Sequence, residues 1–513
     1  MDLEEKLGIA WKRIKLDRKT DFIISNFEYE VFDRFKDELI HNLSKRWENE
    51  GKDYKSQGLR TIRVPKISNT TRPGAVPVID DRLVYQFLVD EIAEAIEPNL
   101  FSLEDKVVHS YRYSGKRTAA DMFRFDTASY KTYLTRIEEL SESYTYLIVT
   151  DISSYFERIY HHELDAVLRE LGAPAFAVDS LMSLLRKWRI GNSYSIPQGI
   201  WPSDYLGNVY LDPIDKYMVR SGYSYCRFVD DICIGAETYR EAQGALLTLE
   251  EQLARLGLGL NAAKTKIIPS DNLYEHMFPF KSRFDQIFKE LRESVPDFAP
   301  YWEPEPDEIE ETVKVPAIQM LFTEQLEQDE PSPHASRFCL KKLRLFQDED
   351  VLEDVLKNLG KLVVVTPQVV NYLVHIAKHT LFSDYQIANE ISAFLQQNQT
   401  CYDWQEMWLL HCLNRIGYFE AGSVSNIREF LMSKKSIHDA VAVNAMLIIG
   451  KHGDNGDKNW LLELYEKEHS IWVKRAILYA LKNLSPTKRN HFYSYCTGSD
   501  PLTDKIIEYV KNS

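Results

Sequence analysis

Two adjacent aspartates within a short β-rich segment constrain this chain more than any other feature. Asp230 and Asp231 interrupt the apolar stretch from Tyr223 to Gly235, a pattern that predicts a strand, a turn and a second strand. Side chains of a strand alternate between its two faces, so consecutive aspartates can share one site only where a turn redirects the backbone. We therefore expect both carboxylates at the tip of a hairpin.

Three further segments carry polar residues that this hairpin does not explain. A short apolar run at 146–149 predicts a buried strand that delivers Asp151 at its end. A loop containing Gln198 and Gly199 leads into a predicted helix, and Lys264 stands after another helix. Nucleotidyl transfer requires such a set, because two Mg²⁺ ions about 4 Å apart are held by carboxylates. Two or three aspartates suffice, since Mg²⁺ keeps waters or substrate phosphates as its other ligands.

Each segment has an ordinary structural explanation when it is taken alone. Adjacent aspartates commonly lie in a solvated turn, and Asp151 could cap the helix that follows it. Gln198 and Gly199 could form a plain turn, and most lysines, Lys264 included, are exposed. The four segments nevertheless occur in one order and at compatible distances, which favours a single shared site.

In this order and spacing, the four segments resemble the palm motifs of reverse transcriptases. The segment Arg72–Tyr85 is similar to the fingers motif of bacterial reverse transcriptases, and His109–Arg112 is similar to the next fingers motif. The resemblance covers about residues 60–290. It implies an α/β right-hand polymerase fold, with fingers and palm, that adds dNTPs to DNA.

The resemblance also implies a role for each candidate site residue. Asp151, Asp230 and Asp231 would bind two Mg²⁺ ions, and Lys264 would act with these catalytic residues by approaching the leaving pyrophosphate. Phe156 would be the steric gate that excludes a ribose 2′-hydroxyl. The remaining dNTP-binding residues would be Arg72 and Arg82, which hold the triphosphate, and Gln198 and Gly199, which line the nucleotide pocket.

Composition shifts along the chain predict four parts. They are a charged helical extension at 1–60, fingers and palm at 61–290, an acidic, Pro-containing linker at 291–335, and an all-α domain at 336–513. Within the last part, Val443–Gly450 and Val473–Ala480 look like copies of each other, about thirty residues apart. This spacing predicts a helical repeat-like (HEAT-like) array that replaces or extends the polymerase thumb.

This architecture resembles the abortive-infection, defence-associated branch of bacterial reverse transcriptases, including AbiK-like proteins and those of P2-type prophages. It implies anti-phage defence, a homo-oligomer, and DNA synthesis that is primed by a protein hydroxyl and needs no conventional template. The single-stranded DNA product would then be attached through a tyrosine. Candidates near or before the palm are Tyr29, Tyr54, Tyr111, Tyr113, Tyr130, Tyr155 and Tyr160.

Two other functions stay open at the level of sequence. One is a conventional templated reverse transcriptase of retron or group II intron type, with an RNA template or noncoding RNA as partner. The other is a degenerate polymerase that acts as a scaffold for RNA or protein, although an intact carboxylate set speaks against it.

Basic residues of the C-terminal part that could contact phosphate are Lys341, Lys342, Arg344, Lys474, Arg475 and Lys482.

Composition limits the setting in which such a protein would work. The net charge of −15 argues against a basic coat over the whole surface but permits a basic groove on an acidic body. The six cysteines form no C-x-x-C pair, which favours a reducing compartment. No run of about eighteen apolar residues occurs, so we expect no membrane span and a cytoplasmic protein.

Overall fold

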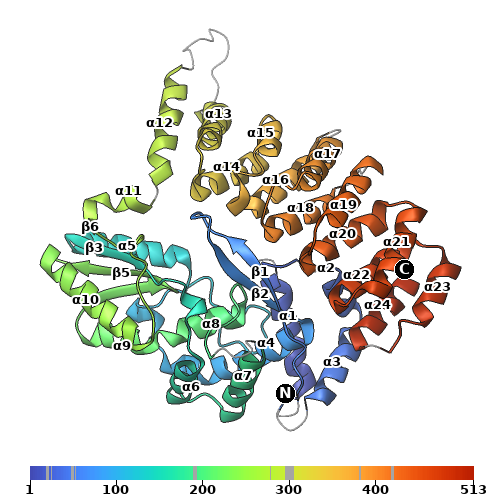
Figure 1. Cartoon of the computed structure of the whole chain (residues 1–513). Coiled ribbons are helices and arrows are strands. Elements are labelled where there is room, and N and C mark those ends of the chain that lie inside the picture. The colour runs from blue at the N-terminus through green and yellow to red at the C-terminus, as the bar shows by residue number, and fades with distance from the viewer. Residues whose placement is uncertain are drawn as a thin grey trace. The chain divides into compact units, whose positions relative to one another are not determined.

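The structure is a computed structural model in which the chain forms two compact units (Figure 1). It describes residues 1–18, 22–24, 26–47, 51, 54–188, 193–277, 279–294, 306–380, 383–416, 421–498 and 500–512. The first unit comprises Met1–Phe22, Lys36–Thr61 and Pro73–Met277, and the second comprises Ile23–Phe35, Ile62–Arg72 and Phe278–Ser513. The segment expected as one N-terminal extension is therefore divided between the units, and the first unit ends at Met277 rather than at 290.

A four-stranded antiparallel sheet is the centre of the first unit. Its strands are β4 (Ser224–Phe228), β5 (Asp231–Ala236), β3 (Tyr146–Asp151) and β6 (Lys266–Pro269), in this order across the sheet. The strand expected at 146–149 and the hairpin expected at 223–235 are both confirmed. Asp151 ends β3, and Asp231 begins β5.

Helices cover both faces of this sheet. On one face, Ile137 of α5 (Tyr130–Ser143) packs into a core cluster with Leu147 and Cys233. Side chains alternate along a strand, so Ile148 and Ile234, both fully buried, point to the opposite face. There α10 (Tyr239–Arg255) packs against β3, β5 and β6. Burial on both faces explains why the strands read as nearly continuous apolar runs.

The first unit also contains eight further α-helices and four 3-10 helices among its described residues, including α1 and α3 from the N-terminal part of the chain. The helices are α1 (Leu3–Asp17), α3 (Lys36–Arg46), α4 (Ile79–Ile96), α6 (His161–Glu170), α7 (Ala175–Trp188), α8 (Trp201–Tyr210), α9 (Asp212–Arg220) and α11 (Leu273–Met277). Short 3-10 helices are η3 (Glu97–Asn99), η4 (Leu103–Asp105), η5 (Tyr155–Glu157) and η6 (Ser270–Asn272). The nearly fully buried α4 packs against α1, α7 and α8. The segment Arg72–Tyr85, which resembles a fingers motif, runs from β2 (Thr71–Pro77) into α4, and β2 pairs with β1 (Leu59–Pro65).

The C-terminal part of the second unit is helical throughout its described residues, as expected. Its helices are α12 (Pro279–Ser294), α13 (Pro306–Glu327), α14 (Pro333–Leu345), α15 (Leu352–Lys357), α16 (Thr366–His379), α17 (Ser383–Gln396), α18 (Asp403–Arg415), α19 (Ala421–Ser433), α20 (Asp439–His452), α21 (Asn455–Lys467), α22 (Ile471–Ala480), α23 (Pro486–Ser494) and α24 (Pro501–Lys511), with η7 (Val363–Val365) and η8 (Leu481–Asn483). Figure 1 shows alternate helices stacked in succession: α14, α16, α18, α20, α22 and α24 form one row, and α15, α17 and α19 form a second. We call the row that begins with α14 the first layer.

The two similar sequence segments lie side by side in this first layer. Val443–Gly450 belongs to α20 and Val473–Ala480 belongs to its neighbour α22. Gly450 faces Ala480 so closely that an added methyl group would overlap the Ala480 backbone carbonyl. The absence of a side chain at Gly450 therefore lets the two helices approach each other.

The acidic segment between the two predicted domains is largely helical where the structure describes it. We predicted a linker at 291–335, but α13 occupies Pro306–Glu327 and contains Pro316 within the helix. Despite its acidic residues and proline, α13 buries Leu321 and Phe322 and packs against α12 and α14. Residues 295–305 of the predicted linker lie outside the described residues.

An N-terminal helix belongs to the C-terminal unit and corrects one sequence assignment. Glu28 of α2 (Asn26–Arg34) accepts a hydrogen bond from Arg475 at 3.0 Å, and Asp500 accepts another at 2.6 Å. Arg475 is only 3% exposed. The proposal that Arg475 contacts phosphate is therefore wrong, because its charge is already paired inside the unit.

No helix in the described part of the chain is long and apolar enough to cross a bilayer.

Candidate active site

Pairing of two strands brings the three aspartates to one end of the sheet. In the antiparallel register of β3 and β5, Asp151 stands directly opposite Asp231. Asp230 precedes Asp231 in the turn, and its carbonyl accepts a hydrogen bond from the Ile152 N–H at 3.3 Å. Residues directly opposite in such a pair have Cβ atoms about 4.5–5.5 Å apart. The geometry therefore groups the carboxylates that the sequence singled out.

The turn that presents the aspartates has a backbone conformation unfavourable for its residue type. Val229 has φ +56°, in the left-handed region that β-branched residues avoid. Its N–H donates to the Ser110 hydroxyl at 2.9 Å, and its carbonyl accepts from Arg227 at 3.2 Å. Both groups of the Val229 backbone are thus held by buried side chains, which offsets the strain.

Arg227 is the centre of a fully buried polar network beneath this turn. Its guanidinium donates to both carboxylate oxygens of Asp215, at 2.7 and 2.6 Å. It also donates to the side chain and to the backbone carbonyl of Asn208, both at 2.7 Å. Ser110 completes the network by donating to Asn208 at 2.9 Å. A paired charge with these hydrogen bonds offsets much of the cost of burying it.

Sequence reasoning missed the role of this network. Asn208, Asp215 and Arg227 all lie in the segments that we compared with palm motifs, but a pattern of residues does not show that they meet below one turn. The only available signal was a charged residue, Arg227, inside a predicted buried strand. Buried charges are rare unless they are paired, so the sequence could have indicated that a partner exists but not which residue it is.

Burial and mutual repulsion make the carboxylates hard to ionise without a cation. Burial, together with the nearby Asp151 carboxylate, raises the pKa of Asp230 to about 7. The same two causes raise the pKa of Asp231 to about 6. Oxygen ligands of this kind suit Mg²⁺, and a bound cation would relieve the repulsion.

Lys264 forms an ion pair with Asp151. Its ammonium donates to Oδ1 of Asp151 at 3.1 Å, and the Asn261 side-chain amide donates to Oδ2 at 3.0 Å. The described residues contain no cluster of three His, Cys, Asp or Glu side chains already arranged around a metal position. Since Lys264 is 62% exposed, it can leave Asp151 when a cation binds.

The expected steric gate, Phe156, lies beside α8 and beside the loop that leads into this helix. Phe156 is 7% exposed, and its carbonyl accepts a hydrogen bond from the Ile196 N–H at 3.1 Å. A methyl group added to Gly207 would lie 3.0 Å from the Phe156 ring, so Gly207 leaves room for that ring. Gln198 and Gly199 follow in the same loop, where Gly199 has φ +91° and faces the ring of Phe22.

The two arginines expected to hold the triphosphate lie in different units of the structure. Arg82 lies in the buried α4 and forms an ion pair with Asp17 of α1 at 2.9 Å. The same Asp17 oxygen accepts a hydrogen bond from the Trp201 N–H at 3.1 Å. Arg72 lies in segment 62–72 of the second unit, and its contact with a triphosphate is a prediction.

Comparisons with known proteins match the part of the chain that contains the carboxylates. The family model described as reverse transcriptase (RNA-dependent DNA polymerase) matches residues 64–282, which include all three aspartates and Lys264. The chain therefore contains a reverse transcriptase domain. Protein YkfC of Escherichia coli K12 is 25% identical over 171 residues, which are 32% of this chain and 42% of YkfC, so the match spans less than half of that relative.

Solved structures with similarity to the chain include two yeast telomerases. Telomerase from Candida albicans in complex with a fragment of telomeric RNA matches at TM-score 0.31 and 11% identity, over 75% of this chain and 71% of that one. Apo telomerase from Candida tropicalis matches at TM-score 0.32 and 10% identity, over 81% and 71%.

The raised pKa of Asp230 predicts a pH-dependent effect on stability. A carboxyl group with a raised folded-state pKa favours folding fully below its unfolded pKa, near 4, and loses that contribution as pH rises through about 7. Asp230→Asn should therefore raise the melting temperature at pH 8 without divalent ions, by roughly 2–4 °C. At pH 4 the two proteins should melt within a degree of each other.

Magnesium supplies the control for this melting experiment. At pH 8, Mg²⁺ should stabilise the wild type and have little effect on Asp230→Asn, so that the difference shrinks or reverses. Equal melting temperatures of the two proteins at pH 8, with and without Mg²⁺, would show that Asp230 neither repels its neighbours nor binds the cation.

Proposed function

We propose that this chain is a Mg²⁺-dependent DNA polymerase of the reverse transcriptase family that adds dNTPs in anti-phage defence by abortive infection, in the cytoplasm. The observation that carries the catalytic part is the placement of Asp151 opposite Asp231, with Asp230 beside them in a buried turn. This part needs no assumption about template, primer or host. The defence role rests on the resemblance to AbiK-like and P2-type prophage proteins.

The proposed chemistry divides the work between cations and the residues of the chain. Two bound Mg²⁺ ions would activate the attacking hydroxyl and stabilise the leaving pyrophosphate. Asp151, Asp230 and Asp231 would hold them, and the Arg227 network would keep the turn in place. Lys264, which neutralises Asp151 before substrate binds, would be released toward the pyrophosphate.

Nucleotide selection would depend on the loop and helix next to the carboxylates. The buried ring of Phe156 would collide with a ribose 2′-hydroxyl, and dNTPs would then be the substrates. Gln198 and Gly199 would line the same pocket. Arg72 and Arg82 would contact the triphosphate, and for Arg82 this requires that phosphate replace Asp17, since a guanidinium binds carboxylate and phosphate by the same fork of N–H groups.

One tyrosine stands out as a candidate for protein priming. Among the seven tyrosines considered, Tyr130 is 46% exposed, whereas Tyr54, Tyr113 and Tyr155 are buried in the same unit. Its ring packs against that of Phe228 at 5.3 Å, and Phe228 is paired with Asp231 across the β4–β5 hairpin. Burial, together with the Asp231 carboxylate, raises the pKa of Tyr130. An exposed phenol beside the hairpin that carries Asp231 supports Tyr130 as the nucleophile for the first nucleotide.

The helical unit would bind the growing single strand or other subunits of a homo-oligomer. Successive helices of the first layer end in a cation: Arg344, Lys378, Arg415 and Lys451 lie in the last turns of α14, α16, α18 and α20, and Lys482 follows α22. Repeated cations at one end of stacked helices form a row suited to phosphates. This row supports nucleic acid as a partner.

The alternatives differ from this proposal in the start of synthesis and in activity itself. A retron-like or group II-like reverse transcriptase would need an RNA template and an annealed primer. A scaffold would bind RNA or protein without synthesis. The strained and repulsive site favours an active enzyme, because a scaffold gains nothing from keeping three adjacent carboxylates.

Purified full-length protein tests the catalytic part of the proposal. Wild type should incorporate labelled dNTPs with Mg²⁺, and Asp231→Asn should lower the rate on the order of 100-fold or more, because a metal ligand is lost. Asp271→Asn, an exposed site beyond β6, is the matched control and should leave the rate unchanged. Incorporation by Asp231→Asn at the wild-type rate would rule out this site.

The same reactions, denatured and run on a gel, test how synthesis starts. With protein priming, label stays on the wild-type protein until nuclease is added. Tyr130→Phe should abolish this attachment while still extending an annealed primer. If all label leaves the protein on denaturation and synthesis requires an added primer, the conventional reverse transcriptase is the correct function.

Phe156→Val tests the assignment of the steric gate. Removal of the ring should raise the ratio of ribonucleotide to deoxynucleotide incorporation by roughly 10- to 200-fold, because selection depends on space for a single hydroxyl. The ratio is measured by competition at equal concentrations, with Phe346→Val in the helical unit as the control. A fixed ratio with a lower overall rate would assign Phe156 to the core alone.

A further inference from the structure

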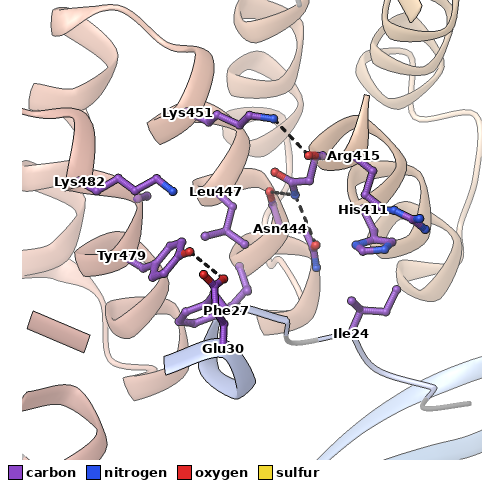
Figure 2. Close-up of a pocket in the computed structure, with 13 residues that line it drawn as sticks. Ile24, Phe27, Glu30, His411, Arg415, Asn444, Leu447, Lys451, Tyr479 and Lys482 are labelled. Carbon is purple, nitrogen blue, oxygen red and sulfur yellow. Dashed lines mark hydrogen bonds between the residues drawn. The ribbon is translucent and has the colours of Figure 1, made fainter. Parts of the chain in front are cut away.

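The helical unit contains a pocket that is separate from the carboxylate site. It has a volume of about 200 Å³ and lies among α2, α18, α20 and η8 at the end of α22 (Figure 2). Its cationic lining residues are Arg415, Lys451 and Lys482, three members of the cation row. Figure 2 shows Lys451 on the side opposite Phe27 and Glu30 of α2.

The charges around this pocket are unbalanced. Among the described residues, none of Arg415, Lys451 and Lys482 forms an ion pair, although Lys451 donates a hydrogen bond to the Asn414 carbonyl at 3.3 Å. The one acid in the lining, Glu30, already accepts hydrogen bonds from the hydroxyls of Tyr479 and Tyr509. Burial and the nearby Lys482 lower the pKa of Lys451, so the two ammonium groups repel each other.

Neutral groups complete a lining that suits a ligand with a polar end and a flat or apolar end. His411 is buried, and burial together with Arg415 lowers its pKa to about 4, so at neutral pH it adds no charge. The Asn414 side-chain amide donates a hydrogen bond to the backbone carbonyl of Asn444 at 3.0 Å. Phe27 provides an aromatic surface, and its ring lies 5.4 Å from that of Tyr479.

We propose that this pocket binds a phosphate monoester, with the phosphoryl group between Lys451, Lys482 and Arg415 and the organic part against Phe27 and Leu447. Lys482 also lies over the Tyr479 ring, 4.9 Å from its centroid, but no carboxylate pairs with the three cations among the described residues. Their mutual repulsion favours an anion that joins them. Phosphate has the charge and the acceptor oxygens to bind all three, and the volume suffices for a phosphoryl group with a small attached moiety. The two sources of this chemistry are a free nucleotide and the 5′-phosphorylated end of a single strand.

Titration calorimetry of the full-length protein in EDTA tests this site without contribution from metal at the carboxylates. The probes are dTMP, inorganic phosphate, thymidine, and (dT)₁₀ with and without a 5′-phosphate. Saturable binding of dTMP with no binding of thymidine is the expected result. Tighter binding of dTMP than of 5′-phosphorylated (dT)₁₀ identifies a nucleotide site, and the reverse order identifies a strand-end site.

Variants distinguish this pocket from any other phosphate-binding surface. Lys451→Gln with Lys482→Gln should weaken dTMP binding at least about tenfold, whereas Lys467→Gln, an exposed lysine of α21 outside the pocket, should not. Leu447→Phe, which fills the cavity without changing charge, should also abolish binding. The proposal is overturned if the wild type binds neither dTMP nor 5′-phosphorylated (dT)₁₀, or if the double variant and Leu447→Phe both bind them as the wild type does.

Discussion

The buried contact between Arg227 and Asp215 is the interaction on which the carboxylate site depends. It fixes the guanidinium that holds the Val229 carbonyl, and Val229 has a backbone conformation that its side chain disfavours. Without this support the turn would relax, and Asp230 and Asp231 would lose their position opposite β3. The strained turn at Val229 and the carboxylates that repel each other therefore lie at one end of the sheet. The ion pair between Arg227 and Asp215 stabilises this end of the sheet.

The sequence predicted the parts of this site that depend on local patterns. Alternation and short apolar runs indicated β3 and the β4–β5 hairpin, and the adjacent aspartates indicated a turn, because two neighbouring carboxylates cannot share a strand face. Motif resemblance then located Asp151 and Lys264, which the structure brings within hydrogen-bonding distance of each other. Each of these inferences uses residues close in sequence or strands with an obvious partner.

Contacts between distant segments could not be predicted in this way. Asp17 meets Arg82, and Glu28 meets Arg475 across more than four hundred residues; neither pairing has a periodic signal. α13 was missed because its acidic residues and prolines resemble a linker, while a buried face decides its structure. The phosphate pocket combines residues from α2 and from the last third of the chain, so its cationic lining is visible only in three dimensions.

Direct measurement of metal binding tests the central claim that the three aspartates hold the catalytic cations. Mn²⁺ titration followed by electron paramagnetic resonance, in the presence of a dNTP, should give about two bound ions per wild-type chain. Asp151→Asn should lower both the number of bound ions and their affinity, since Asp151 stands opposite Asp231 and its charge acts on both other carboxyl groups. An unchanged number and affinity in Asp151→Asn would contradict the account.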